Sequence, residues 1–256
     1  MSAVIYSLWT KPDRLVLLAL SQIAAILFIS IATMALGKSL SGIILLDSAT
    51  TQFSYPFTIQ NFMHLLFFLG VGELYVRWRS AEWELAFAAM GLLPEDSSTI
   101  LQRTNLPPIR QRVAPLYQDE CGYLPYLIDL GILQFMASKS VDQTVTVIDS
   151  SLELIAHRVD LGYAFSRYLV WVIPTIGFIG TVVGIAMALQ QINPDAPDLR
   201  QLTASLGVAF YTTLVALVHS AILVLGLQFI QAREERSVNV AGQYVLKNLI
   251  NRLYAG

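Results

Sequence analysis

The sequence has few charged residues, and they are missing from long stretches. Asp, Glu, Lys and Arg make up 13% of the 256 residues, whereas soluble domains carry about 25%. Four windows contain none of them: Leu15–Gly37, Ser48–Gly72, Tyr168–Pro194 and Gln201–Ala232. Each window is long enough to cross the bilayer as a helix, which takes about 20 residues. The pattern predicts an all-α membrane protein with four transmembrane helices. Polar residues dilute the start of the second window, whose apolar core is Phe62–Val71.

Several kinds of chemistry lack the residues they need. The single cysteine, Cys121, cannot form an internal disulfide. The three histidines, His64, His157 and His219, lie far apart and form no metal-binding spacing. No Gly-rich phosphate loop and no Ser–His–acid arrangement is recognisable. The sequence therefore predicts no enzyme, no cofactor and no metal, and a net charge of −2 gives no reason to expect nucleic acid.

Basic residues are distributed unevenly between the windows. Eight lie from Arg77 to Arg167 and four follow the last window, whereas Lys38 and Arg200 each stand alone in the two remaining gaps. Lys and Arg accumulate on the cytoplasmic side of a membrane. We therefore expect both termini and the middle segment in the cytoplasm, with two short loops outside.

This topology divides the chain into four parts. They are an N-terminal stub with the two outer transmembrane helices (1–78), a cytoplasmic helical segment (79–167), two pore-lining transmembrane helices (168–232) and a cytoplasmic C-terminal helix (233–256).

The cytoplasmic segment shows a change of pattern along its length. A short helix is expected from Ala81 to Met90, followed by an irregular connector over 94–125, where five prolines occur. From Tyr126 apolar residues repeat at three- and four-residue steps, which predicts a long helix that continues into the third span. The fourth helix is expected to continue past Arg233 as an amphipathic tail.

Small and hydroxyl-bearing residues follow one face of each of the last two spans. At helical steps these are Pro174, Gly177, Thr181, Gly184 and Ala188 on the third span, and Ala209, Thr213, Ala216 and Ser220 on the fourth. Gly180 adds to the packing candidates, and Thr175 and Thr212 add to the hydroxyl candidates. Two interpretations remain open. Small residues let helix backbones approach closely, or the faces line a central space in which the threonine hydroxyls bind water or a passing ion.

Three further residues each allow two roles. His219 can relay protons or form a hydrogen bond between helices. Tyr211 can bond a neighbouring subunit or lie at the membrane interface. Pro174 can kink the third span or act as its hinge.

Acidic residues are absent from the first, third and fourth spans. Glu73 follows the second window, and we place it at the cytoplasmic boundary near Arg77 and Arg79. Proton pathways through lipid usually include a carboxylate. If the protein conducts protons, a partner helix must supply the acid.

Two motifs together resemble a known family. The third span reads IPTIGFIGTVVGIAMAL, and after a short loop the fourth reads LGVAFYTTLVALVHSAILV. This order and spacing resemble the MotA/TolQ/ExbB proton channel superfamily, whose members carry a proline, a GxxGTVxGI-like run and a threonine-bearing final span. Four spans with cytoplasmic termini are similar to the MotA plan, whereas the GTVVG run is closer to TolQ and ExbB. Where many relatives carry an acid, this chain has Phe210 and Tyr211.

The resemblance implies an assembly and a mechanism. It implies a bacterial inner-membrane pentamer around a single-span partner of the MotB/TolR/ExbD kind, whose membrane aspartate binds protons or sodium near Thr181 and Thr212 or Thr213. Proton flow would then drive a motor that acts on a periplasmic or envelope target. Two other interpretations remain: a non-conducting membrane scaffold whose small residues serve only packing, and a self-contained transporter. The absence of inverted repeats with broken helices disfavours the transporter.

Overall fold

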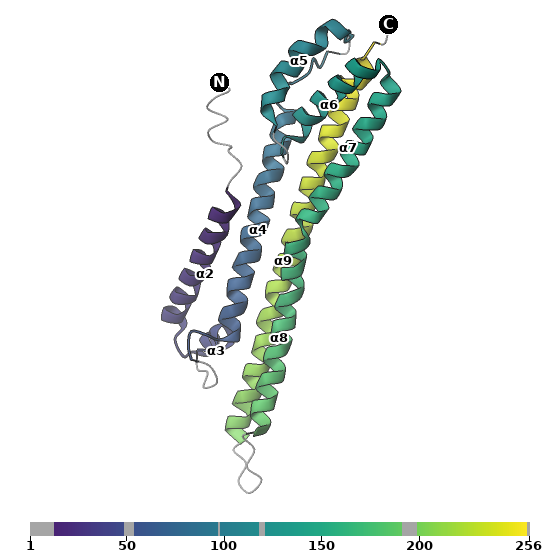
Figure 1. The fold of residues 1–256 in the computed structure, drawn as a ribbon. Coiled ribbons are helices and arrows are strands. Elements are labelled where there is room, and N and C mark those ends of the chain that lie inside the picture. Colours follow the sequence, from purple (N-terminus) through teal and green to yellow (C-terminus); the bar gives the residue numbers. More distant parts are fainter. Residues whose placement is uncertain (1–12, 49–53, 97, 118–120, 191–198, 255–256) are drawn as a thin grey trace. The chain divides into compact units, whose positions relative to one another are not determined.

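The computed structural model describes residues 13–48, 54–96, 98–117, 121–190 and 199–254, which are mainly helical (Figure 1). The α-helices are α2 (Arg14–Leu36), α3 (Leu40–Leu46), α4 (Ile59–Ala88), α5 (Leu106–Val113), α6 (Tyr123–Ser138), α7 (Val141–Gly162), α8 (Ala164–Gln190) and α9 (Leu199–Asn248). The short 3₁₀ helices are η1 (Arg103–Asn105), η2 (Ala114–Leu116) and η3 (Ile250–Arg252). The described ranges contain no strand, only an isolated bridge between Leu101 and Leu253. The predicted all-α class is confirmed.

Four helical segments of the described chain are long and apolar enough to cross a membrane. They are Arg14–Leu36, Ile59–Ala88, Val141–Gln190 and Ser205–Arg252. The third joins α7 to α8, and the fourth runs along α9. This confirms the predicted number of spans and the helical extensions of the last two.

The chain forms two compact units. The span unit consists of Pro12–Val76 and Ala164–Gln228, so it joins the first two spans to the last two. The extension unit consists of Arg77–Tyr163 and Phe229–Gly256, together with Met1–Lys11, which lies outside the described residues. Both α4 and α9 pass from one unit into the other.

The second span begins later and ends later than its charge-free window indicates. The Thr58 hydroxyl accepts a hydrogen bond from the Asn61 backbone N–H at 3.1 Å, which satisfies a free donor in the first turn of α4. The helix then runs to Ala88 without a break. The separate short helix predicted from Ala81 to Met90 was therefore wrong, because no proline and no glycine after Gly72 interrupts α4.

The connector predicted over 94–125 was also wrong in part, since it contains α5. Pro107 and Pro108 lie in the first turn of this helix. Proline is tolerated there, because the first backbone N–H groups have no partner within the helix and the fixed φ of proline suits the helix. These two residues help to begin a helix where their composition had suggested irregular structure.

The long helix predicted from Tyr126 is interrupted. Helix α6 ends at Ser138, Lys139 adopts a left-handed φ of 57°, and α7 begins after Ser140. The Ser140 hydroxyl accepts a hydrogen bond from the Gln143 backbone N–H at 3.3 Å and caps α7. The two helices pack against each other, because the chain reverses at this point. The prediction failed because it relied on glycine or proline to mark a break, and the left-handed residue is a lysine.

Helix α6 begins at a buried carboxylate from α4. The two Glu84 carboxylate oxygens accept hydrogen bonds from the backbone N–H groups of Gly122 and Tyr123, each at 2.8 Å. A negative charge at a helix N-terminus satisfies free donors and is favoured by the helix dipole. This contact fixes the start of α6 within the extension unit.

Candidate ion-conducting site

The third and fourth spans pack closely through small residues. Helices α8 and α9 lie side by side within the span unit (Figure 1). A Cβ added to Gly184 would lie 2.7 Å from the Ala209 Cβ, and one added to Gly180 would lie 2.8 Å from the Thr212 hydroxyl. A Cβ on Gly177 would overlap the Ala216 Cβ. Only glycine fits at these positions of α8, because the neighbouring helix occupies the space.

Thr181 and Thr213 meet across this interface. Their hydroxyls form a hydrogen bond with each other. The Thr181 hydroxyl also lies 2.9 Å from the Ala209 carbonyl, and the Thr213 hydroxyl lies 3.1 Å from the Gly177 carbonyl. Both side chains are half-buried. The pair is an uncharged group of hydroxyl donors and acceptors between the two helices that remains partly accessible.

Thr212 and Thr175 have different surroundings. Thr212 is 2% exposed, and its hydroxyl donates to the Ala209 carbonyl at 2.7 Å. The half-buried Thr175 donates to the Trp171 carbonyl of its own helix at 3.0 Å. The structure therefore groups Thr181 with Thr213, places Thr212 inside the helix interface and leaves Thr175 apart from the pair.

Pro174 lies inside α8 and creates an unpaired acceptor. Proline has no backbone N–H, so the carbonyl four residues earlier loses its helical hydrogen bond. That carbonyl belongs to Val170, and the Ser220 hydroxyl of α9 donates to it at 3.1 Å. Side chains of neighbouring helices commonly satisfy such carbonyls in membrane helices. Ser220, predicted as a packing residue, is thus also the hydrogen-bond partner of the proline-freed carbonyl.

His219 does not face the threonine pair. Its ring stacks on Phe67 of α4, with centroids 4.4 Å apart, and meets His64 edge-on at 4.8 Å. No local sequence pattern indicates this contact. The half-buried Tyr211 lies beside Gly207, one turn earlier on its own helix.

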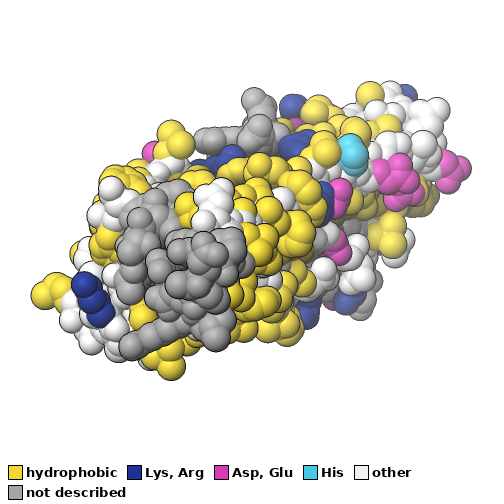
Figure 2. All heavy atoms as spheres, turned by 90° about the horizontal axis from the view of Figure 1, so that it is seen from below, with side chains coloured by type: hydrophobic (Ala, Val, Ile, Leu, Met, Phe, Trp, Pro, Cys, Tyr) yellow, Lys and Arg dark blue, Asp and Glu magenta, His cyan; other side chains and the backbone are white. Residues whose placement is uncertain are grey.

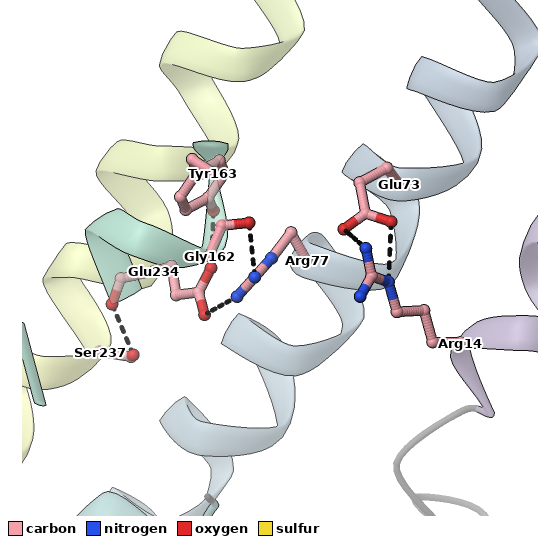
Figure 3. Close-up of polar contacts among 7 residues, drawn as sticks. All are labelled: Arg14, Glu73, Arg77, Gly162, Tyr163, Glu234 and Ser237. Atoms are coloured by element: carbon pink, nitrogen blue, oxygen red, sulfur yellow. Dashed lines mark hydrogen bonds and ion pairs between the residues drawn. The ribbon is translucent and has the colours of Figure 1, made fainter. Parts of the chain in front are cut away.

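Glu73 is paired, but with a residue that the sequence did not indicate. Its carboxylate is 1% exposed and meets Arg14 of α2 through two N–O contacts of 3.0 Å (Figure 3). The described residues of the span unit contain two other carboxylates, Asp13 and Asp47. Asp13 caps α2, and Asp47 also has a partner. No described carboxylate of the span unit is therefore free to carry an ion.

The extension unit contains a second buried acid that is held by several partners. Glu234 of α9 is 1% exposed, lies 3.5 Å from the Arg77 guanidinium and accepts a hydrogen bond from the Tyr163 hydroxyl at 2.7 Å (Figure 3). Arg77 also donates to the Gly162 carbonyl at 2.6 Å. These contacts join α4, the end of α7 and α9. No group of three or more candidate metal ligands occurs in the described ranges.

Comparison with known proteins supports the resemblance drawn from the two motifs. Residues 127–242 match the model of the MotA/TolQ/ExbB proton channel family. The match covers just under half of the chain, from α6 to α9, and includes both motifs. No curated protein and no solved structure matches the chain significantly. The match agrees with the superfamily resemblance, and the four apolar helices indicate a multi-pass membrane protein.

Proposed function

From this family match we propose that the chain is the channel subunit, or A-type stator subunit, of a proton-driven membrane motor. It assembles as a homo-oligomer, most simply a pentamer, around a single-span partner with a membrane aspartate. Ion flow moves the partner, which acts on a periplasmic or envelope target. The ion is a proton, with sodium as the alternative that the test below distinguishes.

The hydroxyl pair of Thr181 and Thr213 is the observation that carries this proposal. Hydroxyls donate and accept hydrogen bonds without carrying charge. Both are half-buried in a single chain, so they are accessible from one side of the α8–α9 interface. The carboxylates of the described span unit all have partners. An acid supplied by a partner helix beside the threonine pair would complete an ion-binding group.

Exposed apolar side chains on α8 and α9 support assembly in a membrane. The most exposed on the two helices include Phe178, Phe210, Leu217 and Phe229, with exposures between 55% and 70%. Hydrophobic side chains also cover much of the surface seen in Figure 2. Such surfaces need lipid or other helices beside them. We assign α8 and α9 to the centre of the ring and α2 and α4 to its lipid-facing layer.

The proposed orientation rests on the basic residues. The extension unit carries most of the Lys and Arg, which supports a cytoplasmic position for this unit and for both termini. Together with the family match, this supports a location in the bacterial inner membrane.

Substitution of the threonine pair tests the proposal. Thr181→Val and Thr213→Val keep the side-chain volume but remove the hydroxyls. Hydrogen bonds to a charged group contribute about 1.5–3 kcal/mol, so we expect ion flux to fall about ten- to hundredfold. Flux is measured in liposomes that contain the protein and its co-expressed partner, under a proton gradient and separately under a sodium gradient. Thr181→Ser and Thr213→Ser are the matched controls, because they retain the hydroxyls.

The alternative function is a non-conducting oligomeric scaffold. The close fit of Gly180 and Gly184 against α9 favours it, since small residues on this face have a packing role. A scaffold tolerates the valine variants, with the same ring size in particle images and the same biological output. Loss of flux with an intact ring supports the channel, whereas flux unchanged by both valines supports the scaffold.

A further inference from the structure

Two histidines and a glutamine lie together in the span unit, away from the threonine pair. His64 of α4 is 1% exposed and His219 of α9 is 8% exposed. Gln60 is fully buried and precedes His64 by four residues, so the two share one face of α4. Phe28 of α2 and Phe67 of α4 contact the histidine rings. The result is a polar cluster enclosed by aromatic side chains.

The hydrogen bonds of this cluster are incomplete. The His64 Nε2 lies 3.0 Å from the Leu45 carbonyl, and a carbonyl can only accept, so Nε2 carries the proton. The Nδ1 atom of neutral His64 therefore has a lone pair. This Nδ1 is buried and has no partner, and the same is true of the His219 Nδ1 and of both amide atoms of Gln60. Unpaired buried polar atoms are rare and unfavourable, so these four atoms point to a ligand.

The unpaired atoms define the chemistry of that ligand. With its proton on Nε2, His219 also has a lone pair on Nδ1, and the two imidazoles then require two donated hydrogens. The Gln60 amide nitrogen can donate one hydrogen bond, and its oxygen can accept one. A water molecule has two hydrogens for the two Nδ1 atoms and an oxygen that accepts from the Gln60 amide. An added proton would rest on an imidazole nitrogen, since imidazole is a much stronger base than water, so the ligand itself is neutral.

We propose that His64, His219 and Gln60 form a binding site for one water molecule between α4 and α9. The site is separate from the α8–α9 threonine pair and does not depend on ion conduction there. The hydrogen bond from the His64 Nε2 to the Leu45 carbonyl fixes the orientation of the ring and therefore of its unpaired Nδ1.

The charged groups around the site are few. Helix α2 has no charged residue after Arg14, α4 has none before Glu73, and α9 has none from Ser205 to Ala232. From α3 the nearest carboxylate in sequence is Asp47, two residues after Leu45, and it has a partner of its own. Few charged groups therefore surround the site, which suits a neutral ligand such as water.

Nitrogen NMR of the protein in lipid bilayers tests the site. The chain has only three histidines, so selective ¹⁵N-histidine labelling gives a spectrum that can be assigned with single variants. We expect the Nδ1 signals of His64 and His219 to have the shift of a hydrogen-bond acceptor and to correlate with an exchangeable hydrogen.

The exposed His157 of α7 is the internal control, because its ring lies at the surface of the extension unit. Gln60→Leu should shift both buried histidine signals. Gln22→Leu is the matched control: Gln22 bonds the Leu65 carbonyl at 3.3 Å, so its loss should leave both signals unchanged.

His219→Phe keeps an aromatic ring against Phe67 and should shift the His64 signal even if Gln60→Leu fails to fold. Free lone-pair shifts for both Nδ1 atoms, or a His64 signal unmoved by His219→Phe, would overturn the proposal.

Discussion

Each of the two units is held together internally by a different kind of contact. In the span unit, glycines of α8 meet Ala209, Thr212 and Ala216, and hydroxyls bond backbone carbonyls of the neighbouring helix. In the extension unit, charged side chains join the helices, for example Arg110 with Asp129 at 3.0 Å. Charges are unfavourable in lipid, whereas uncharged hydroxyls and close backbone packing are compatible with it. The contrast agrees with the small number of carboxylates among the described residues of the span unit.

Removal of the Glu234 carboxylate should have the largest effect on stability. Glu234→Ala leaves Arg77 and the Tyr163 hydroxyl without their shared acceptor in a buried position. Loss of one member of a buried ion pair destabilises by about 3–5 kcal/mol, and we expect the lower end because Arg77 keeps its bond to the Gly162 carbonyl. Hydrogen exchange of α7 and the end of α9 measures the effect.

Glu235→Ala is the matched control for this prediction. Glu235 is exposed, and its carboxylate accepts a hydrogen bond from the Gln231 side chain at 2.9 Å. The exchange rates should stay close to those of the unsubstituted protein. Equal protection from hydrogen exchange in the Glu234 and Glu235 variants would contradict the claim that buried charged contacts hold the extension unit together.

The stability of the span unit should fall most when a larger side chain fills the narrow space between its helices. Gly184→Ala places a methyl group 2.7 Å from the Ala209 Cβ and 3.0 Å from its Cα, so α8 and α9 must separate. Overpacking typically destabilises by about 1–3 kcal/mol. Gly207→Ala is the control, because its Cβ would meet only the Tyr211 ring at an ordinary 3.6 Å. That variant should gain up to about 1 kcal/mol from the better helix propensity of alanine.

Thermal unfolding in detergent compares the two glycine variants. A lower midpoint for Gly184→Ala and an equal or higher midpoint for Gly207→Ala are expected. If both variants unfold at the same temperature, the close approach of α8 and α9 is not a main source of stability.

The sequence predicted the spans better than the contacts between them. Charge-free windows locate α2, α8 and α9 because lipid imposes a local composition on each helix. The turn at Lys139 has no comparable signal, since any residue can adopt a left-handed φ when its surroundings favour it. The pairing of Glu73 with Arg14 joins residues 59 positions apart and depends on how α2 and α4 pack.

One contact of the candidate site could have been anticipated in part. Pro174 in a helix indicates that the Val170 carbonyl needs another donor. The identity of that donor, Ser220, depends on the register between α8 and α9, which the sequence pattern did not give. The His64–His219 contact lacks even this partial signal, because no local rule relates the two residues.

A double-mutant cycle can sharpen the role of the uncharged contacts. Ser220→Ala leaves the Val170 carbonyl without a partner and should destabilise by about 1 kcal/mol. In a Pro174→Ala background, the new backbone N–H at position 174 can bond that carbonyl, so the same serine change should have almost no effect. Unfolding midpoints of the four proteins give the coupling. Additive effects would show that Ser220 does not act through the proline-freed carbonyl.

The smallest effect is expected at an exposed charge of the extension unit. Hydrogen bonds from the Ser98 hydroxyl and the Ser98 backbone N–H hold the pKa of Asp96 below its usual value, with a further bond from the Thr99 hydroxyl. Because the folded pKa is lowered, the stabilisation is present above the unfolded value and is lost as the pH falls through the folded one. Ser98→Ala removes only the hydroxyl, so the Asp96 pKa should rise partway toward 3.8 and stability at neutral pH should fall slightly. Carboxyl NMR titration measures the shift, and Ser150→Ala, an exposed serine of α7, should leave it unaltered. An Asp96 titration that is identical in Ser98→Ala and the parent would mean that water replaces this hydrogen bond without a change in the pKa. Exposed charged contacts often contribute this little.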